Sequence, residues 1–123
     1  MSTTIKKRIN SFIYAFRGVG DSWQTQLHLR IHTVVAILAL AACYGFKVAL
    51  WEWVAVIICI GLVTGMEIMN TAIEYVVNLV SPEFHPLAGK AKDAAAGAVL
   101  VCALAALAVG LYIFGPRLIP FLM

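Results

Sequence analysis

Three polar residues lie within eight positions of one another in an otherwise apolar stretch of the chain: Glu67, Asn70 and Glu74. At 100° per residue they fall within an arc of about 60°, so an α-helix would carry all three on one face. The two carboxylates would be separated by roughly 10 Å along the helix axis. That distance is too long for sharing a proton or one bare metal ion, and it suits two carboxylates with separate tasks.

The composition indicates that lipid surrounds most of the chain. Of the 123 residues, 63% are hydrophobic and only 12% are charged, and the mean hydropathy is +0.94. Soluble domains have about half apolar and a quarter charged residues. At about 20 residues per span, the length has room for three membrane helices in a single domain, residues 1–123. A chain this short cannot enclose a deep pocket alone, so we expect an oligomer whose sites borrow surface from a neighbouring copy.

The apolar pattern predicts an all-α membrane protein with one surface helix and three spans. Apolar residues at helical spacing, mixed with Lys and Arg, predict an amphipathic helix on the membrane surface over about 4–26. Gly18 and Gly20 are expected to weaken or end this helix. Membrane helices are expected at 30–46, 51–80 and 94–115.

Proline positions and charges predict the connections between these helices. Ser81-Pro82 should end the second membrane helix, and residues 81–93 should form a polar cytoplasmic loop. Pro116 should close the third membrane helix.

The distribution of cations predicts the orientation in the membrane. One side of the predicted spans carries Lys6, Lys7, Arg8, Arg17, Arg30, Lys90 and Lys92, and the other carries Lys47 and Arg117. The positive-inside rule therefore places the N-terminus and the 81–93 loop in the cytoplasm and the C-terminus outside. Glu67 would then lie deep, beside a lipid headgroup, and Glu74 would lie nearer to water, metal and nucleotide.

A carboxylate at membrane depth costs at least about 2.5 kcal/mol and is normally retained where it meets a partner or a substrate. Glu67 is therefore a candidate functional residue. The alternative is a structural hydrogen bond between helices, made by a neutral Glu67, since burial favours the uncharged form. For Glu74 the alternative is simple solvation at the interface.

The cluster Lys90, Lys92 and Asp93 directly precedes the predicted third span. A helix N-terminus favours an anion, and the lysines add positive charge, so a phosphate is expected to bind here. Lysines beside a span also act simply as topology signals. The small residues at 94–98 would let another helix approach closely, which packing alone explains.

Several other classes of protein are disfavoured. The sequence has no Gly-x-x-x-x-Gly-Lys-Ser/Thr loop and no His-Arg-Asp loop, which excludes the ordinary NTPase and protein-kinase machinery. Lys and Arg occur in short groups beside apolar spans, which argues against nucleic-acid binding. The cysteines lie in apolar runs, and His28, His32 and His85 form no zinc-ligand pattern with them.

Two runs together resemble the signature of the bacterial membrane diacylglycerol kinase/undecaprenol kinase family. They are Glu-Ile-Met-Asn-Thr-Ala-Ile-Glu at 67–74 and Glu-Phe-His-Pro-Leu-Ala-Gly-Lys-Ala-Lys-Asp at 83–93. The resemblance covers nearly the whole chain, including the amphipathic arm, the segment Arg30-Ile-His32 and the three spans. The run that begins at His85 is more similar to the undecaprenol kinases than to the diacylglycerol kinases of the family.

The resemblance implies a homotrimer in the bacterial cell membrane that transfers the γ-phosphate of ATP, with Mg²⁺, to a lipid alcohol. Undecaprenol is the first expected acceptor and diacylglycerol the second. Glu67 would be the general base for the lipid hydroxyl, Asn70 would orient the reacting groups, and Glu74 would bind magnesium. The residues implied to hold the nucleotide are Lys7, Tyr14, Glu83, Phe84, His85, Lys92 and Asp93, and those implied to contact the lipid are Glu67 and Ala96.

One position departs from the family pattern. Members usually carry a glutamate, a second metal ligand, four residues before the arginine of the Arg-x-His segment, and here that position is Gln26. The amide keeps an oxygen ligand but loses a negative charge, which should weaken magnesium binding. A non-catalytic family member therefore remains an alternative.

A small proton-coupled transporter, with Glu67 binding protons in turn, is the alternative from another class. It gives no role to Glu74 or to the cluster around Lys92. ATP consumption and ATP-dependent labelling of lipid distinguish the three readings.

Overall fold

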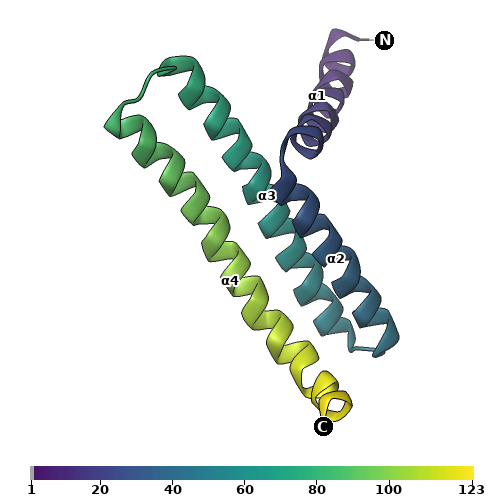
Figure 1. The fold of residues 1–123 in the computed structure, drawn as a ribbon. Helices are drawn as coiled ribbons and strands as arrows, with labels where there is room; N and C mark the ends of the chain where they lie inside the picture. The colour runs from purple at the N-terminus through teal and green to yellow at the C-terminus, as the bar shows by residue number, and fades with distance from the viewer. Residues whose placement is uncertain (1) are drawn as a thin grey trace.

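The computed structural model describes residues 2–123, which form four α-helices: α1 (Thr3–Thr25), α2 (Leu27–Gly45), α3 (Leu50–Val80) and α4 (Pro86–Leu122). The last three are each long and apolar enough to cross a membrane, which confirms the all-α class with three candidate spans. Figure 1 shows these three as an antiparallel bundle, with α1 projecting from the end where α3 and α4 are joined. We call this the α1 end, and the end that carries the C-terminus the far end.

α1 is a continuous helix with an apolar face. The Ser2 hydroxyl caps its first turn by accepting a hydrogen bond from the Ile5 N–H at 3.3 Å. Of the two expected effects of Gly18 and Gly20, weakening or ending the helix, the second was wrong, because the helix runs through both to Thr25, close to the predicted bounds of 4–26. A glycine costs a helix only about 1 kcal/mol. The backbone is extended at Gln26 (φ −114°, ψ 108°), and this residue turns the chain into α2.

α4 begins eight residues before the predicted start at position 94. Pro86 lies in its first turn, and His85 caps the helix, with Nδ1 accepting from the Leu87 N–H at 3.1 Å. Proline suits this place because its missing N–H would have no partner there. The loop therefore covers only residues 81–85, and the prediction of a loop over 86–93 was wrong.

Pro116 does not close α4 either, since the helix continues through Pro116 and Pro120 to Leu122. A proline removes one backbone hydrogen bond, and the segment after it is held from outside. Arg117 makes a bidentate ion pair with Glu52 at the start of α3, at 2.8 and 2.9 Å. Arg117 also donates to the Ile113 carbonyl at 2.6 Å. These bonds keep the end of α4 in helical register against α3.

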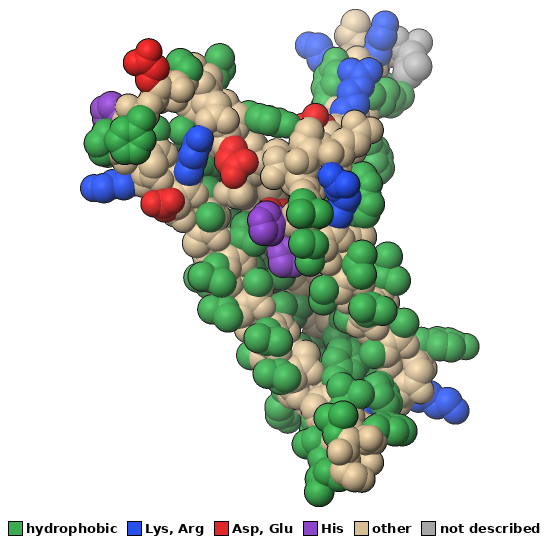
Figure 2. All heavy atoms as spheres, in the orientation of Figure 1, with side chains coloured by type: hydrophobic (Ala, Val, Ile, Leu, Met, Phe, Trp, Pro, Cys, Tyr) green, Lys and Arg blue, Asp and Glu red, His purple; other side chains and the backbone are tan. Residues whose placement is uncertain are grey.

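α3 is the central helix of the bundle and packs against both α2 and α4. At the far end the buried side chains of Cys43, Val56 and Ile113 form a small core. Most of the remaining large apolar side chains are exposed, as expected for surfaces that face lipid. Figure 2 shows that charged and histidine side chains gather over the α1 end, whereas the rest of the visible face is mainly apolar. The α1 end is thus the more polar end of the bundle, and the candidate site lies there.

Candidate active site

One stripe of α3 carries both an apolar groove and the polar residues singled out from the sequence. It comprises Val56, Ile60, Val63, Glu67, Asn70 and Glu74. The steps between these residues alternate between four and three, the spacing that keeps side chains on one helix face. We call this stripe the α3 seam. Its polar part is the direct continuation of its apolar part toward the α1 end.

The apolar part of the seam forms the floor of a groove between α2, α3 and α4. The groove encloses about 530 Å³ and is walled by α2 residues such as Val35 and Ala39 and by α4 residues such as Ala106 and Phe114. Toward the α1 end, the last α2 and α3 residues that line it are Ile31, His32 and Thr64. A hydrocarbon chain lying in this groove would therefore point its head toward the polar part of the seam.

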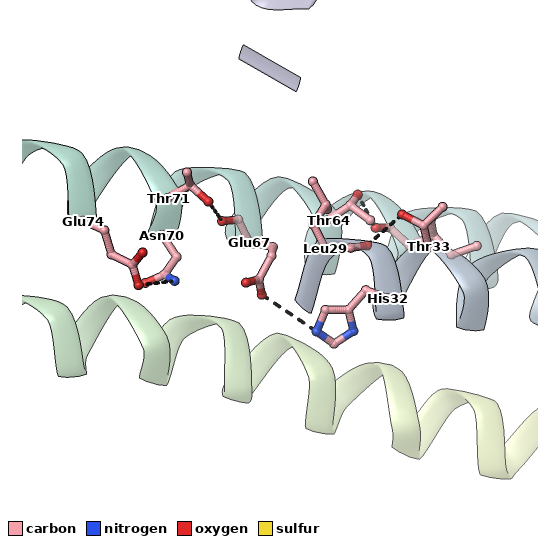
Figure 3. Close-up of polar contacts among 9 residues, drawn as sticks. Leu29, His32, Thr33, Thr64, Glu67, Asn70, Thr71 and Glu74 are labelled. Atoms are coloured by element: carbon pink, nitrogen blue, oxygen red, sulfur yellow. Dashed lines mark hydrogen bonds and ion pairs between the residues drawn. The ribbon is translucent and has the colours of Figure 1, made fainter. Parts of the chain in front are cut away.

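Glu67 lies one turn beyond Val63, the last seam residue that lines the groove, and only 4% of its surface is exposed. Figure 3 shows its side chain, with those of Asn70 and Glu74, pointing from α3 toward α4. The Glu67 Oε2 atom lies 3.8 Å from Nε2 of His32 on α2. The Thr71 hydroxyl donates to the Glu67 main-chain carbonyl at 3.1 Å and not to the Glu67 carboxylate.

His32 is the residue at this site that the sequence did not reveal. The sequence placed it in the Arg30-Ile-His32 segment of the family resemblance and excluded a zinc pattern, but it indicated no role for this side chain. The contact with Glu67 joins residues 35 positions apart on different helices, and such a pairing depends on how α2 packs against α3. A histidine within a membrane helix is itself a signal of function.

Asn70 and Glu74 lie close to each other on α3, one and two turns beyond Glu67 toward the α1 end. Asn70 Nδ2 lies 3.5 Å from Oε1 of Glu74. The Asn70 Oδ1 atom is buried and, among residues 2–123, has no hydrogen-bond partner. In that part of the chain no three Asp, Glu, His or Cys side chains converge as a metal cage. Mg²⁺ is usually bound by one or two carboxylates together with substrate phosphates, so a carboxylate beside an unpaired amide oxygen fits magnesium that arrives with a nucleotide.

Lys92 reaches the same region from α4. Its Nζ atom donates to Oδ1 of Asn78 at 2.6 Å, one turn beyond Glu74 on α3. Because α4 starts at Pro86, Lys92 and Asp93 lie in its second and third turns and not at a helix N-terminus, which corrects the expected reason for anion binding there. Asp93 is exposed, as is Ala96 one turn further along the helix.

The remaining predicted nucleotide residues are dispersed within one chain. Lys7 and Tyr14 lie on exposed parts of α1, and Glu83, Phe84 and His85 lie in the exposed loop. Gln26 is half-buried between α1 and α2, where its main-chain N–H donates to the Ser22 carbonyl at 2.9 Å. Within residues 2–123 no hydrogen bond or ion pair joins any of these side chains to the α3 seam.

α1 is nevertheless tied to α3 beside the seam. The hydroxyl of Tyr75, the residue after Glu74, donates to Asp21 Oδ2 at 2.7 Å. The same hydroxyl lies 3.5 Å from Oγ1 of Thr25. The orientation of α1 is thereby coupled to the polar end of α3.

Comparison with known proteins identifies the family. The sequence model of the prokaryotic diacylglycerol kinases matches residues 13–114. The undecaprenol kinase of Bacillus subtilis is 37% identical over 114 residues, which are 93% of this chain and 93% of that protein. The diacylglycerol kinase of Synechocystis is 39% identical over 116 residues, which are 92% of this chain and 65% of that protein. The diacylglycerol kinase of Escherichia coli K12 is 31% identical over 105 residues, which are 85% of this chain and 86% of that protein.

These matches extend over most of the chain and include relatives named for two different acceptors. They confirm the kinase class and leave the choice of lipid to other arguments. The chain belongs to the prokaryotic diacylglycerol kinase family and is a membrane-spanning, ATP-dependent lipid kinase.

Proposed function

We propose that this kinase transfers the γ-phosphate of ATP to undecaprenol, with diacylglycerol as the alternative acceptor. The observation that carries the proposal is the continuity of the α3 seam, in which the buried Glu67 follows one turn after Val63, the last seam residue that lines the apolar groove. Apart from His32 and Thr64, the side chains that line the groove are apolar or Cys59. The Thr64 hydroxyl already donates to the Ile60 carbonyl at 2.7 Å.

This lining favours a polyprenol over a diacylglycerol. A polyprenol has a hydrocarbon body and one hydroxyl, so it leaves no other polar group to satisfy. A diacylglycerol adds two ester groups, whose oxygens need hydrogen-bond donors or water when they are buried. The 37% identity to an undecaprenol kinase over 93% of both chains is compatible with this choice.

Glu67 acts in this proposal as the general base that takes the proton of the lipid hydroxyl. Phosphoryl transfer has a loose transition state, so alignment of the attacking oxygen and neutralisation of charge provide most of the catalysis. Asn70 orients the groups between the two carboxylates, and Lys92 places a positive charge on the nucleotide side. Glu74 and Asn70 Oδ1 would hold Mg²⁺ together with phosphate oxygens, and Gln26 would offer a neutral ligand. When bound, the metal would neutralise charge on the phosphates.

The proposal also includes a homotrimer and a cytoplasmic α1 end. Lys7 and Tyr14 lie on α1, away from the seam of their own chain, so a neighbouring copy would complete the nucleotide site. Seven cations at the α1 end against two at the far end favour a cytoplasmic position for α1. ATP would then reach Glu74 from the side where it is available.

The test supplies purified protein in micelles with γ-labelled ATP, Mg²⁺ and either undecaprenol or dioctanoylglycerol. We expect kcat/KM to be higher for undecaprenol, and we expect Glu67→Gln to lower kcat by about 10²- to 10⁴-fold, the range for loss of a general base. Thr71→Val is the matched control because the Thr71 hydroxyl donates to the main-chain carbonyl of Glu67 and not to its carboxylate. A higher kcat/KM for dioctanoylglycerol would show that diacylglycerol, and not undecaprenol, is the preferred acceptor. A wild-type rate for Glu67→Gln would show that Glu67 is not the general base.

A second experiment tests the groove. Ala106 lines the groove, whereas its neighbour Ala105 is exposed and does not. Ala106→Phe should narrow the groove and slow phosphorylation of undecaprenol more than that of a short prenol such as farnesol. Ala105→Phe should leave both rates near the wild-type values. Equal effects of the two substitutions would show that the acceptor chain lies elsewhere.

A further inference from the structure

We infer that His32 is a positioning residue for the acceptor: its Nε2–H donates a hydrogen bond to the oxygen of the lipid hydroxyl while Glu67 accepts the proton of the same hydroxyl. This inference rests on the proposed function, because it assigns a second protein contact to the reacting group. Neither the sequence motifs nor the names of the relatives give His32 a role in the reaction.

The distance between the two side chains is the first argument. His32 Nε2 and Glu67 Oε2 are 3.8 Å apart, which is longer than a direct N–H···O bond of about 2.7–3.2 Å. A single oxygen atom placed about 2.8 Å from each would complete a triangle with hydrogen bonds to both. One hydroxyl oxygen lying to the side of the line between the two atoms could therefore bridge the pair.

The surroundings of the pair are the second argument. His32 lines the end of the apolar groove, and the side chain of Glu67 is only 5% exposed. Thr64 is the other oxygen- or nitrogen-bearing side chain that lines the groove, and its hydroxyl is occupied by the Ile60 carbonyl. His32 is thus the nitrogen donor available to a head group that arrives along the groove.

The chemistry of a hydroxyl is compatible with both contacts. Its oxygen has one hydrogen and two lone pairs. The hydrogen is donated to Glu67, one lone pair accepts the Nε2–H of His32, and the second lone pair attacks the γ-phosphorus. The new O–P bond forms as the bond to the ADP oxygen breaks, ADP leaves with the electron pair, and the proton moves to Glu67. Fixing two of the directions around the oxygen leaves the third aimed at the phosphate.

Two polar substitutions that differ in reach test the inference. His32→Gln places an amide N–H near the position of Nε2, whereas the side chain of His32→Asn is one methylene shorter. We expect His32→Asn to lower kcat/KM for undecaprenol by about 10- to 100-fold, the range for a lost hydrogen bond to a group that develops charge. We expect His32→Gln to stay within about fivefold of the wild type, and the KM for ATP to change less than about twofold in both. His28→Asn is the matched control, because His28 is exposed one turn earlier on α2.

Lipid binding without ATP provides the readout that a purely structural role would not change. In His32→Asn the affinity for undecaprenol should fall, whereas the affinity for the analogue in which hydrogen replaces the hydroxyl should stay the same. Equal losses for both lipids, equal activities of the Asn and Gln variants, or an effect of His28→Asn as large as that of His32→Asn would overturn the inference. A wild-type protein that labels neither lipid would overturn the proposed function and this inference together. An active wild type with unaffected His32 variants would overturn the inference alone.

Discussion

The hydrogen bond from Tyr75 to Asp21 fastens α1 to α3, and Tyr75→Phe removes it. The bond is 2.7 Å long, and Thr25 Oγ1 lies 3.5 Å from the same hydroxyl. Because both partners are exposed, its net contribution is expected to be about 1 kcal/mol, below the range of about 1.5–3 kcal/mol for bonds to charged groups. This free energy corresponds to about a fivefold change in the ratio of docked to undocked α1. If Lys7 and Tyr14 hold the nucleotide, the KM for ATP rises by no more than about fivefold.

Two measurements test this chain of reasoning. An ATP titration at saturating lipid should show the higher KM with kcat within about twofold of the wild type. A pulsed electron paramagnetic resonance experiment on spin labels at positions 10 and 79, in a background without the native cysteines, should show a broader distance distribution. Tyr44→Phe is the matched control, since Tyr44 is an exposed tyrosine near the other end of α2. Asp21→Asn keeps an acceptor oxygen and should have a smaller effect than Tyr75→Phe.

An unchanged KM together with an unchanged distance distribution in Tyr75→Phe would show that the bond to Asp21 does not position α1 for nucleotide binding. α1 would then be held by its apolar face in the lipid surface, and the contact with Tyr75 would be incidental to nucleotide binding.

Three further predictions concern the metal, the nucleotide and the far end. Gln26→Glu should raise the apparent affinity for magnesium, because it adds a negative charge to the ligand set, and an unchanged magnesium titration would contradict it. Lys92→Met should raise the KM for ATP by about tenfold through loss of a cation, whereas Asn78→Leu, which removes only the partner of Lys92, should change it much less. Arg117→Met should lower the midpoint of thermal unfolding because it leaves the buried carboxylate of Glu52 unpaired. Glu52→Leu combined with Arg117→Met should recover most of that loss, and equal midpoints for the single and double variants would contradict this account.

The sequence was sufficient where a local signal decided the structure. The apolar run of α3 and its end before Ser81-Pro82 were evident, because a proline two positions after the helix restricts the backbone there. α4 was predicted to start too late because Lys90, Lys92 and Asp93 were interpreted as a loop. Lysine and alanine are good helix formers, and the decisive signal was the cap at His85 with Pro86 in the first turn.

Features that depend on packing between helices were not accessible. The helical spacing of Glu67, Asn70 and Glu74 correctly predicted one face of α3, because that spacing is a property of a single helix. The approach of His32 to Glu67, and the contact of Arg117 with Glu52 that holds α4 beyond Pro116, join distant parts of the chain. Their geometry is set by how the helices cross, which residue spacing alone does not encode.

The unequal lengths of the helices bear on where a membrane boundary would cross the molecule. α2 has 19 residues and rises about 28 Å, close to the hydrocarbon thickness of about 30 Å. α3, with 31 residues, rises about 46 Å and extends past it. Along the axis of α2, its first residue Leu27 lies about 7.5 Å from His32 toward the α1 end. Along the axis of α3, Glu74 lies about 10 Å from Glu67 in the same direction. With the first turn of α2 at the boundary, the two carboxylates would lie on opposite sides of it, and a lipid alcohol would meet a water-borne phosphate donor with its tail still in the bilayer.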